Sequence, residues 1–167
     1  MSRRSLIVGV VAALVAGAVL TVAPANALTN CTVSAGEVGN DAEELDLLSR
    51  VNEYRTANGR QPLSVDTGLN RAAAWFSRDM ADKSYFPGNH VDSLGRVLGA
   101  RIEGCGVQFR TAGENIAAGN ATGAATFEQW RDSPGHNANM LKSDFTRAGV
   151  ARAFNGASTY GWYWTLD

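Results

Sequence analysis

The spacing of apolar residues changes along the chain, and this change restricts the folds that the chain can adopt. Over residues 66–83 apolar side chains recur every three or four positions, which predicts a helix with one buried face. Residues 149–154 and 159–166 instead alternate, as strands do, and Asn155-Gly156 between them is a hairpin signal. Helices followed by paired strands predict an α+β fold, with the helices packed on an antiparallel sheet.

Further helices are predicted on either side of the chain's midpoint. Residues 41–58 begin with acidic side chains, where the helix dipole favours negative charge, and end at Asn58-Gly59. Residues 120–133 form another helix, with Thr122 as its N-cap and Pro134-Gly135 after it. The shorter expected elements are helical turns at 93–102 and 136–141 and a strand or extended segment at 114–118.

The N-terminus has the layout of an export signal. A basic start, an apolar run at 6–22 and Ala25-Asn26-Ala27 predict a signal peptide, residues 1–27, cleaved after Ala27. The alternative is a retained membrane anchor, although a run of about 17 residues is at the lower limit for a span. The paired arginines leave twin-arginine and ordinary export open. We therefore expect a secreted protein with an N-terminal arm at 28–40 and one domain at 41–167.

The composition argues against two classes of partner. Removal of residues 1–27 takes two arginines and leaves 13 basic and 16 acidic residues, a formal net charge of −3. Nucleic-acid binding needs clustered Lys and Arg to neutralise phosphates, and the nearest such cluster, Arg147 with Arg152, is sparse. No second apolar stretch could span a bilayer. We expect no nucleic-acid partner and no membrane span after signal cleavage.

The chain has two cysteines, Cys31 and Cys105. An even count in an exported chain favours a disulfide. The alternative is two buried free thiols, but Cys31 lies in a polar segment that does not resemble a core. We predict a Cys31–Cys105 bond that ties the N-terminal arm to the domain.

Few side chains are candidates for chemistry. His90 and His136 are the two histidines, and both lie in polar, turn-rich segments, where a histidine is more often structural or exposed. Glu114 has apolar neighbours, so it either needs a partner for a buried charge or faces outward. Two histidines and one glutamate make a zinc set with an open fourth position, but their spacing matches no local metal motif. No nucleophile elbow or phosphate loop is present, and the tryptophans are interpreted as core.

Six short fragments of the sequence, taken in order across residues 41–167, form a recognisable set. They are LLSRVNEYR at 47–55, LNRAA at 69–73, His90, GENIA at 113–117, WRDSPGHNANML at 130–141 and YWTLD at 163–167. Together they resemble the CAP superfamily (cysteine-rich secretory proteins, antigen 5 and pathogenesis-related 1 proteins) in its bacterial, SCP-like form.

The resemblance implies a three-layer α-β-α sandwich with a central antiparallel sheet, and a cleft that holds two histidines and two acids. His90, Glu114 and His136 match three of these positions. The second acid of many eukaryotic members falls on Ser133 here, with Asp132 beside it, so these two are the candidates for the fourth cleft position. Family members whose cleft binds zinc or another divalent cation imply such an ion at this site.

Function is less restricted than fold, because the superfamily includes lipid and sterol binders, signalling and antimicrobial proteins and some claimed proteases. We expect a non-enzymatic extracellular binding module, with no catalytic residue, whose partner is a small ligand, a lipid or a cell-envelope component. One alternative is a metal-dependent hydrolase of peptide or cell-wall material, in which Glu114 is a third ligand or the general base. The other is a structural envelope protein.

Overall fold

The computed structural model describes residues 31–167, and the predicted signal peptide lies outside them. Within this range no helix combines the length and the apolar character that crossing a membrane requires. The N-terminal arm, expected to be irregular, contains one short helix, α1 (Ala35–Val38). Its first turn is held by a capping box, because the backbone N–H of Ser34 donates to Glu37 Oε2 at 2.8 Å.

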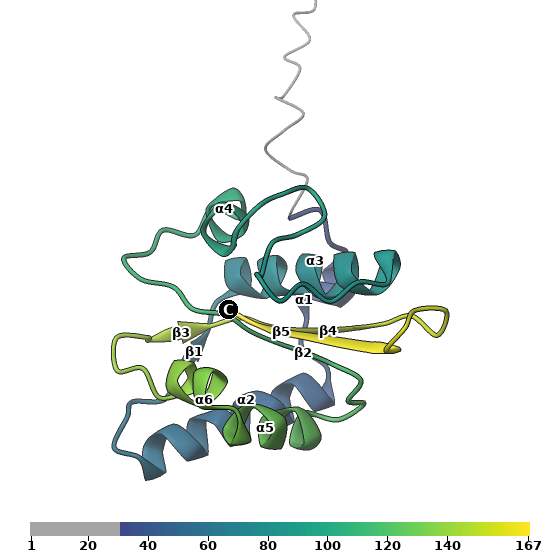
Figure 1. Ribbon diagram of the computed structural model, residues 1–167. Coiled ribbons are helices and arrows are strands. Elements are labelled where there is room, and N and C mark those ends of the chain that lie inside the picture. The colour runs from purple at the N-terminus through teal and green to yellow at the C-terminus, as the bar shows by residue number, and fades with distance from the viewer. Residues whose placement is uncertain (1–30) are drawn as a thin grey trace, which may run out of the picture.

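A small antiparallel sheet lies in the middle of the fold (Figure 1). Its strands run in the order β2 (Asn115–Ala118), β5 (Trp162–Leu166) and β4 (Val150–Phe154). A separate parallel pair joins β1 (Ser64–Val65) to β3 (Arg147–Ala148). The sequence did not predict this pair, because two residues are too few to show an alternating pattern.

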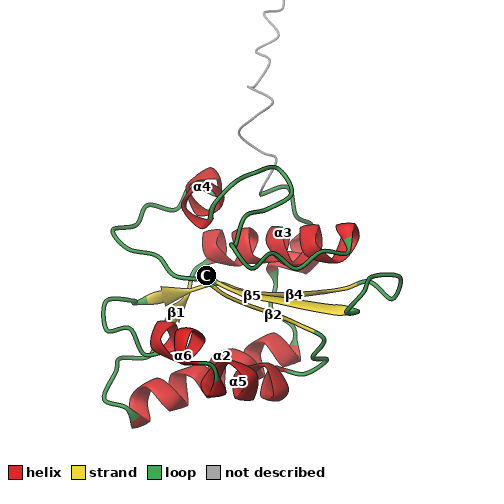
Figure 2. Ribbon diagram, viewed as in Figure 1, coloured by secondary structure: helices red, strands yellow, loops and turns green. Residues whose placement is uncertain are grey.

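Helices cover both faces of the sheet, which gives three layers (Figures 1 and 2). On one side α3 (Thr67–Lys83) packs against β4 and β5, with α1 and α4 (Leu98–Gly104) on the same side. On the other side lie α2 (Ala42–Ala57), α5 (Gly123–Asp132) and α6 (Pro134–Met140). This mixed arrangement is the fold class that the sequence predicted.

Strand β5 contributes to the core on both sides of the sheet, because neighbouring residues of a strand point to opposite faces. Trp164 packs in a cluster with Trp130, whereas Tyr163 packs in another with Phe76. All four rings are 0% exposed. Burial of such a side chain contributes about 1.5–3 kcal/mol relative to its exposure. Trp130 and Trp164 therefore belong to the core, as the sequence indicated.

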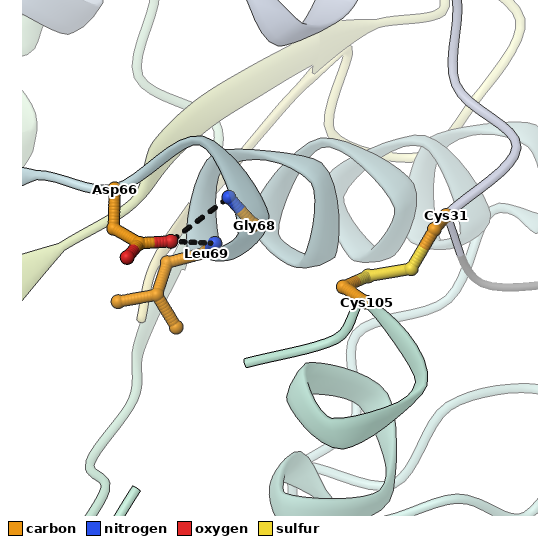
Figure 3. The surroundings of a disulfide bond; sticks show 5 residues. All are labelled: Cys31, Asp66, Gly68, Leu69 and Cys105. Atoms are coloured by element: carbon orange, nitrogen blue, oxygen red, sulfur yellow. Dashed lines mark hydrogen bonds between the residues drawn. A yellow bond between two sulfur atoms is a disulfide. The ribbon is translucent and has the colours of Figure 1, made fainter. Parts of the chain in front are cut away.

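Side-chain caps begin the three long helices and explain why the sequence located them well. Asp66 Oδ1 accepts hydrogen bonds from the backbone N–H groups of Gly68 at 2.9 Å and Leu69 at 3.1 Å (Figure 3). Asp41 and Thr122 cap α2 and α5 in the same way. Each cap satisfies donors that have no partner inside the helix.

The connection between β4 and β5 is longer than the two-residue turn that Asn155-Gly156 predicted. The backbone N–H of Asn155 donates to Gly161 O at 2.9 Å, so the loop extends from 155 to 161. The positive φ of this loop belongs to Gly161, at 74°. Tyr160, expected in the strand, consequently lies in the loop.

The predicted disulfide is present between Cys31 and Cys105, whose Cα atoms are 5.3 Å apart. Cys105 caps the end of α4, so the bond ties the N-terminal arm to that helix (Figure 3). Val107, two residues after Cys105, packs closely on the first turn of α3. A Cβ atom on Gly68 would lie 2.3 Å from Val107 Cγ2, so this position has no room for a larger residue.

Candidate functional site

His90 lies in the loop between α3 and α4, in an unusual backbone conformation. Its φ is 58°, in the left-handed region that residues other than glycine seldom occupy. The backbone N–H of His90 donates to Pro87 O at 3.2 Å, and its carbonyl accepts from Arg101 Nη1 at 2.9 Å. These bonds fix the backbone at a cost in conformational energy, which surrounding structure has to offset.

The buried carboxylate of Asp79, in α3, accepts hydrogen bonds from the loop that carries His90. Its oxygens accept hydrogen bonds from Ser93 N at 2.9 Å, Ser93 Oγ at 2.6 Å and Tyr85 Oη at 2.5 Å. Burial alone would raise the pKa of Asp79, but these hydrogen bonds and nearby Lys83 hold that pKa below its usual value. The ionised carboxylate therefore stabilises both ends of the loop.

We expect Asp79→Asn to destabilise the domain by about 1–3 kcal/mol at pH 7, because donors to the carboxylate lose their charged acceptor. The pKa of Asp79 is lower in the folded chain than in the unfolded chain, where it is about 3.9. The carboxylate therefore stabilises the fold at pH values above about 3.9, and this contribution is lost as the pH falls through the folded-state pKa. Urea unfolding at pH 7 and pH 3 measures the effect, with Asp82→Asn on the exposed side of α3 as control. An Asp79→Asn deficit equal at both pH values would contradict this role.

Glu114 lies immediately before β2 and is 6% exposed. Its Oε1 lies 2.8 Å from His90 Nδ1, and its Oε2 accepts a hydrogen bond from Arg101 Nη2. Burial alone would raise the pKa of Glu114, but the bond to His90 and the charge of Arg101 hold it below its usual value. An ionised carboxylate only accepts hydrogen bonds, so His90 Nδ1 carries the proton between them.

His136 lies in the first turns of α6, where Pro134 begins the helix. Its Nδ1 lies 2.9 Å from Ser133 Oγ, and its carbonyl accepts a hydrogen bond from Asn115 Nδ2 at 3.0 Å. Burial lowers the pKa of His136, and the charge of His90 lowers it further. His136 therefore favours its neutral form.

The structure brings some of the predicted site residues together and separates others. Glu114 contacts His90 directly, and Ser133 contacts His136. The side chain of Asp132 is 75% exposed and lies 3.5 Å from Arg131 Nε, whereas Ser133 Oγ lies beside the His136 ring. Across residues 31–167 no three His, Cys, Asp or Glu side chains gather as a set of metal ligands.

A divalent cation nevertheless fits the chemistry of the two imidazoles. In each ring Nδ1 is hydrogen-bonded to a partner that can accept its proton, Glu114 Oε1 or Ser133 Oγ. Neither Nε2 atom makes a hydrogen bond within the described part of the chain. Rings held in this way can present the Nε2 lone pair to an ion, as metal-binding histidines do.

Two titratable residues at the site were not singled out from the sequence. Arg101 is 0% exposed and reaches both His90 and Glu114 from α4. Both side-chain oxygens of Asp167 are buried, and burial together with the neighbouring charge of Glu114 raises the pKa of Asp167 well above its usual value. In the sequence, Arg101 stands next to apolar residues and Asp167 follows a strand. Neither feature is distinctive enough to indicate a functional residue.

A cavity of about 510 Å³ lies beside the site without including its histidines. Glu114 and Asn115 contribute to its wall, together with apolar residues of α3, α4 and the loop before β2. Because neither His90 nor His136 lines it, the cavity and the pair of imidazoles are separate features, and Glu114 and Asp167 lie between them.

The chain matches the model of the CAP (cysteine-rich secretory protein) family over residues 48–167. It is 33% identical over 135 residues to the uncharacterized protein YkwD of Bacillus subtilis (strain 168), with 81% of this chain and 52% of YkwD covered. It is also 36% identical over 107 residues to the uncharacterized membrane protein YlbC of the same organism, with 64% and 30% covered. The chain therefore spans about half or less of these relatives.

Two solved structures have a similar fold. An extracellular protein containing an SCP domain from Bacillus anthracis str. Ames has a TM-score of 0.64 and 30% identity, covering 74% of this chain and 39% of that one. An outer surface protein from Borrelia burgdorferi has a TM-score of 0.67 at 19% identity, covering 77% and 92%. The second likeness is one of fold alone.

Proposed function

Because the chain belongs to the cysteine-rich secretory protein (CAP) family, we propose that it is an extracellular binding module that holds a divalent cation, such as zinc, between His90 and His136. The observation that carries this proposal is that the two imidazole rings make the same pattern of hydrogen bonds. Each has Nδ1 in a hydrogen bond and leaves Nε2 without one among the described residues. Imidazole nitrogen is a preferred ligand of zinc and of other divalent transition metals.

Two imidazoles alone leave most of the coordination sphere to other donors. Structural zinc sites have four protein ligands, whereas sites with fewer keep positions for water or for a bound molecule. An ion held by His90 and His136 would therefore supply a Lewis acid that an oxygen of an extracellular ligand can reach. A small ligand, a lipid or a cell-envelope component with such an oxygen is the class of partner that this site suits.

The surroundings of Glu114 favour binding over hydrolysis. A general base needs a carboxylate that is free to take a proton from water. Both oxygens of Glu114 are engaged, one with His90 and the other with Arg101, and the side chain is 2% exposed. Its charge is thereby committed to orienting His90, which supports a module without turnover.

The extracellular location rests on independent features of the chain. Its N-terminal segment has the pattern of an export signal. The bond between Cys31 and Cys105 is of a kind that persists in oxidising compartments. Both are consistent with the extracellular and outer-surface proteins that share its fold.

Metal analysis of the exported protein, followed by a screen for hydrolysis of peptide and cell-wall substrates, tests the proposed function. We expect about one zinc ion per chain after dialysis against micromolar zinc, and no turnover above that of the His136→Ala variant. Turnover that needs both the metal and His136 would show that the hydrolase alternative is correct. Absence of bound metal would contradict the proposal.

A further inference from the structure

Arg101 is the one side chain that contacts both His90 and Glu114 in the hydrogen bonds described above. Its Nη1 donates to His90 O at 2.9 Å and to Arg96 O at 3.0 Å, and its Nη2 donates to Glu114 Oε2. The guanidinium carbon lies 3.9 Å above the ring centroid of Phe76. Arg101 therefore joins the strained backbone of His90 to the carboxylate that holds the His90 ring.

The charge of Arg101 matters because two carboxyl groups lie together at this place. Glu114 is buried beside Asp167, and both carboxyl oxygens of Asp167 are buried without an N–H or O–H donor from residues 31–167. Arg101 contacts Glu114 in an ion pair whose two side chains are 0% and 2% exposed.

We propose that Arg101 is a positioning residue of the cation site: it fixes the Glu114 carboxylate and the His90 backbone so that the His90 proton stays on Nδ1 and the lone pair on Nε2. The expected effect on zinc affinity rests on the proposed function, whereas the position of the His90 proton is a property of the metal-free protein. Lysine cannot replace this arginine, because a single ammonium group lacks the planar fork that reaches two acceptors in fixed directions.

Arg55 provides a matched control for the loss of a buried arginine. It is also 0% exposed, and it donates to four backbone carbonyls, those of Gln61, Met140, Lys142 and Phe145. None of these acceptors is a side chain of the site. The pair Arg101→Lys and Arg55→Lys therefore compares equal chemical changes, one at the site and one away from it.

Zinc affinity of the two variants, measured by calorimetry, is the first readout. Removing the hydrogen-bonding partner of a metal ligand typically costs 10- to 100-fold in affinity. Because Arg101 acts on the His90 ring through Glu114, we expect a loss of about tenfold for Arg101→Lys and less than about threefold for Arg55→Lys. Equal losses in the two folded variants, or none in Arg101→Lys, would overturn the proposal.

The ring tautomer of His90 is the second readout, and it separates this inference from the proposed function. Nitrogen-15 NMR of the metal-free chain at pH 8.5, where imidazole is ordinarily neutral, reports which ring nitrogen carries the proton. The chain has two histidines, so His136→Gln assigns the His90 signals. We expect the Nδ1–H form in the wild type and a mixture in Arg101→Lys. An Nε2–H form in the wild type would refute the inference without any variant and whether or not zinc binds.

Discussion

Replacing both cysteines by serine is expected to lower the free energy of unfolding by about 4 kcal/mol. The Cys31–Cys105 bond closes a loop with a sequence separation of 74 residues. In the chain-entropy model, closing a loop of this length lowers the conformational entropy of the unfolded chain, which raises its free energy by about 4 kcal/mol. The bond also holds the end of α4, the helix that carries Arg101.

Urea denaturation of wild type and of the Cys31→Ser/Cys105→Ser variant measures this effect. Reductant is the internal control, because it should destabilise the wild type by a similar amount and leave the variant unchanged. A difference below about 1 kcal/mol would mean that the unfolded chain is not restricted by the bond in the way the entropy model assumes.

The double variant His90→Gln/His136→Gln is expected to lose zinc binding by more than about 100-fold, because it removes both imidazole ligands. Glu114→Gln should weaken binding by only about tenfold, since it alters a partner of His90 rather than a ligand. Equilibrium dialysis with zinc measures all three proteins.

Asp132→Asn is the matched control for these variants, because the Asp132 side chain is 75% exposed and pairs with Arg131. It should bind zinc as the wild type does. If Glu114→Gln lost as much affinity as the double variant, Glu114 would be a ligand, and the arrangement described above would be wrong.

The helices and the later strands could be predicted because each leaves a local pattern. The stripe in α3 and the alternation in β5 follow from which faces are buried, and the caps Asp41, Asp66 and Thr122 mark the helix starts. The short pair β1 and β3 could not be predicted, because its two-residue strands depend on long-range contact. Helix α4 begins at Leu98 rather than near 93, since Asp92 Oδ1 accepts from the backbone N–H groups of Leu94 and Arg96 and forms a turn first.

The candidate site shows a similar division. Resemblance indicated His90, Glu114 and His136, since these positions belong to recognisable motifs. It could not show how the side chains interact, because their spacings in the sequence do not fix distances in the fold. The role of Arg101 depends on α4 packing over Phe76, and that of Asp167 depends on the end of β5 lying beside Glu114. Such contacts arise from tertiary packing and leave no sequence period.

Calorimetric titration of zinc into the metal-free chain, at pH 7.5 and pH 5.5, tests the binding of an ion by His90 and His136 most directly. Each imidazole must be neutral to bind, so protons compete with the ion below the reference value of about 6.5. Burial and the neighbouring charge lower the pKa of His136, so its lone pair stays available to a lower pH than that of a free imidazole. We therefore predict one zinc ion per chain at pH 7.5 and about tenfold weaker binding at pH 5.5. No heat of binding at either pH, or equal affinity at both, would contradict the account.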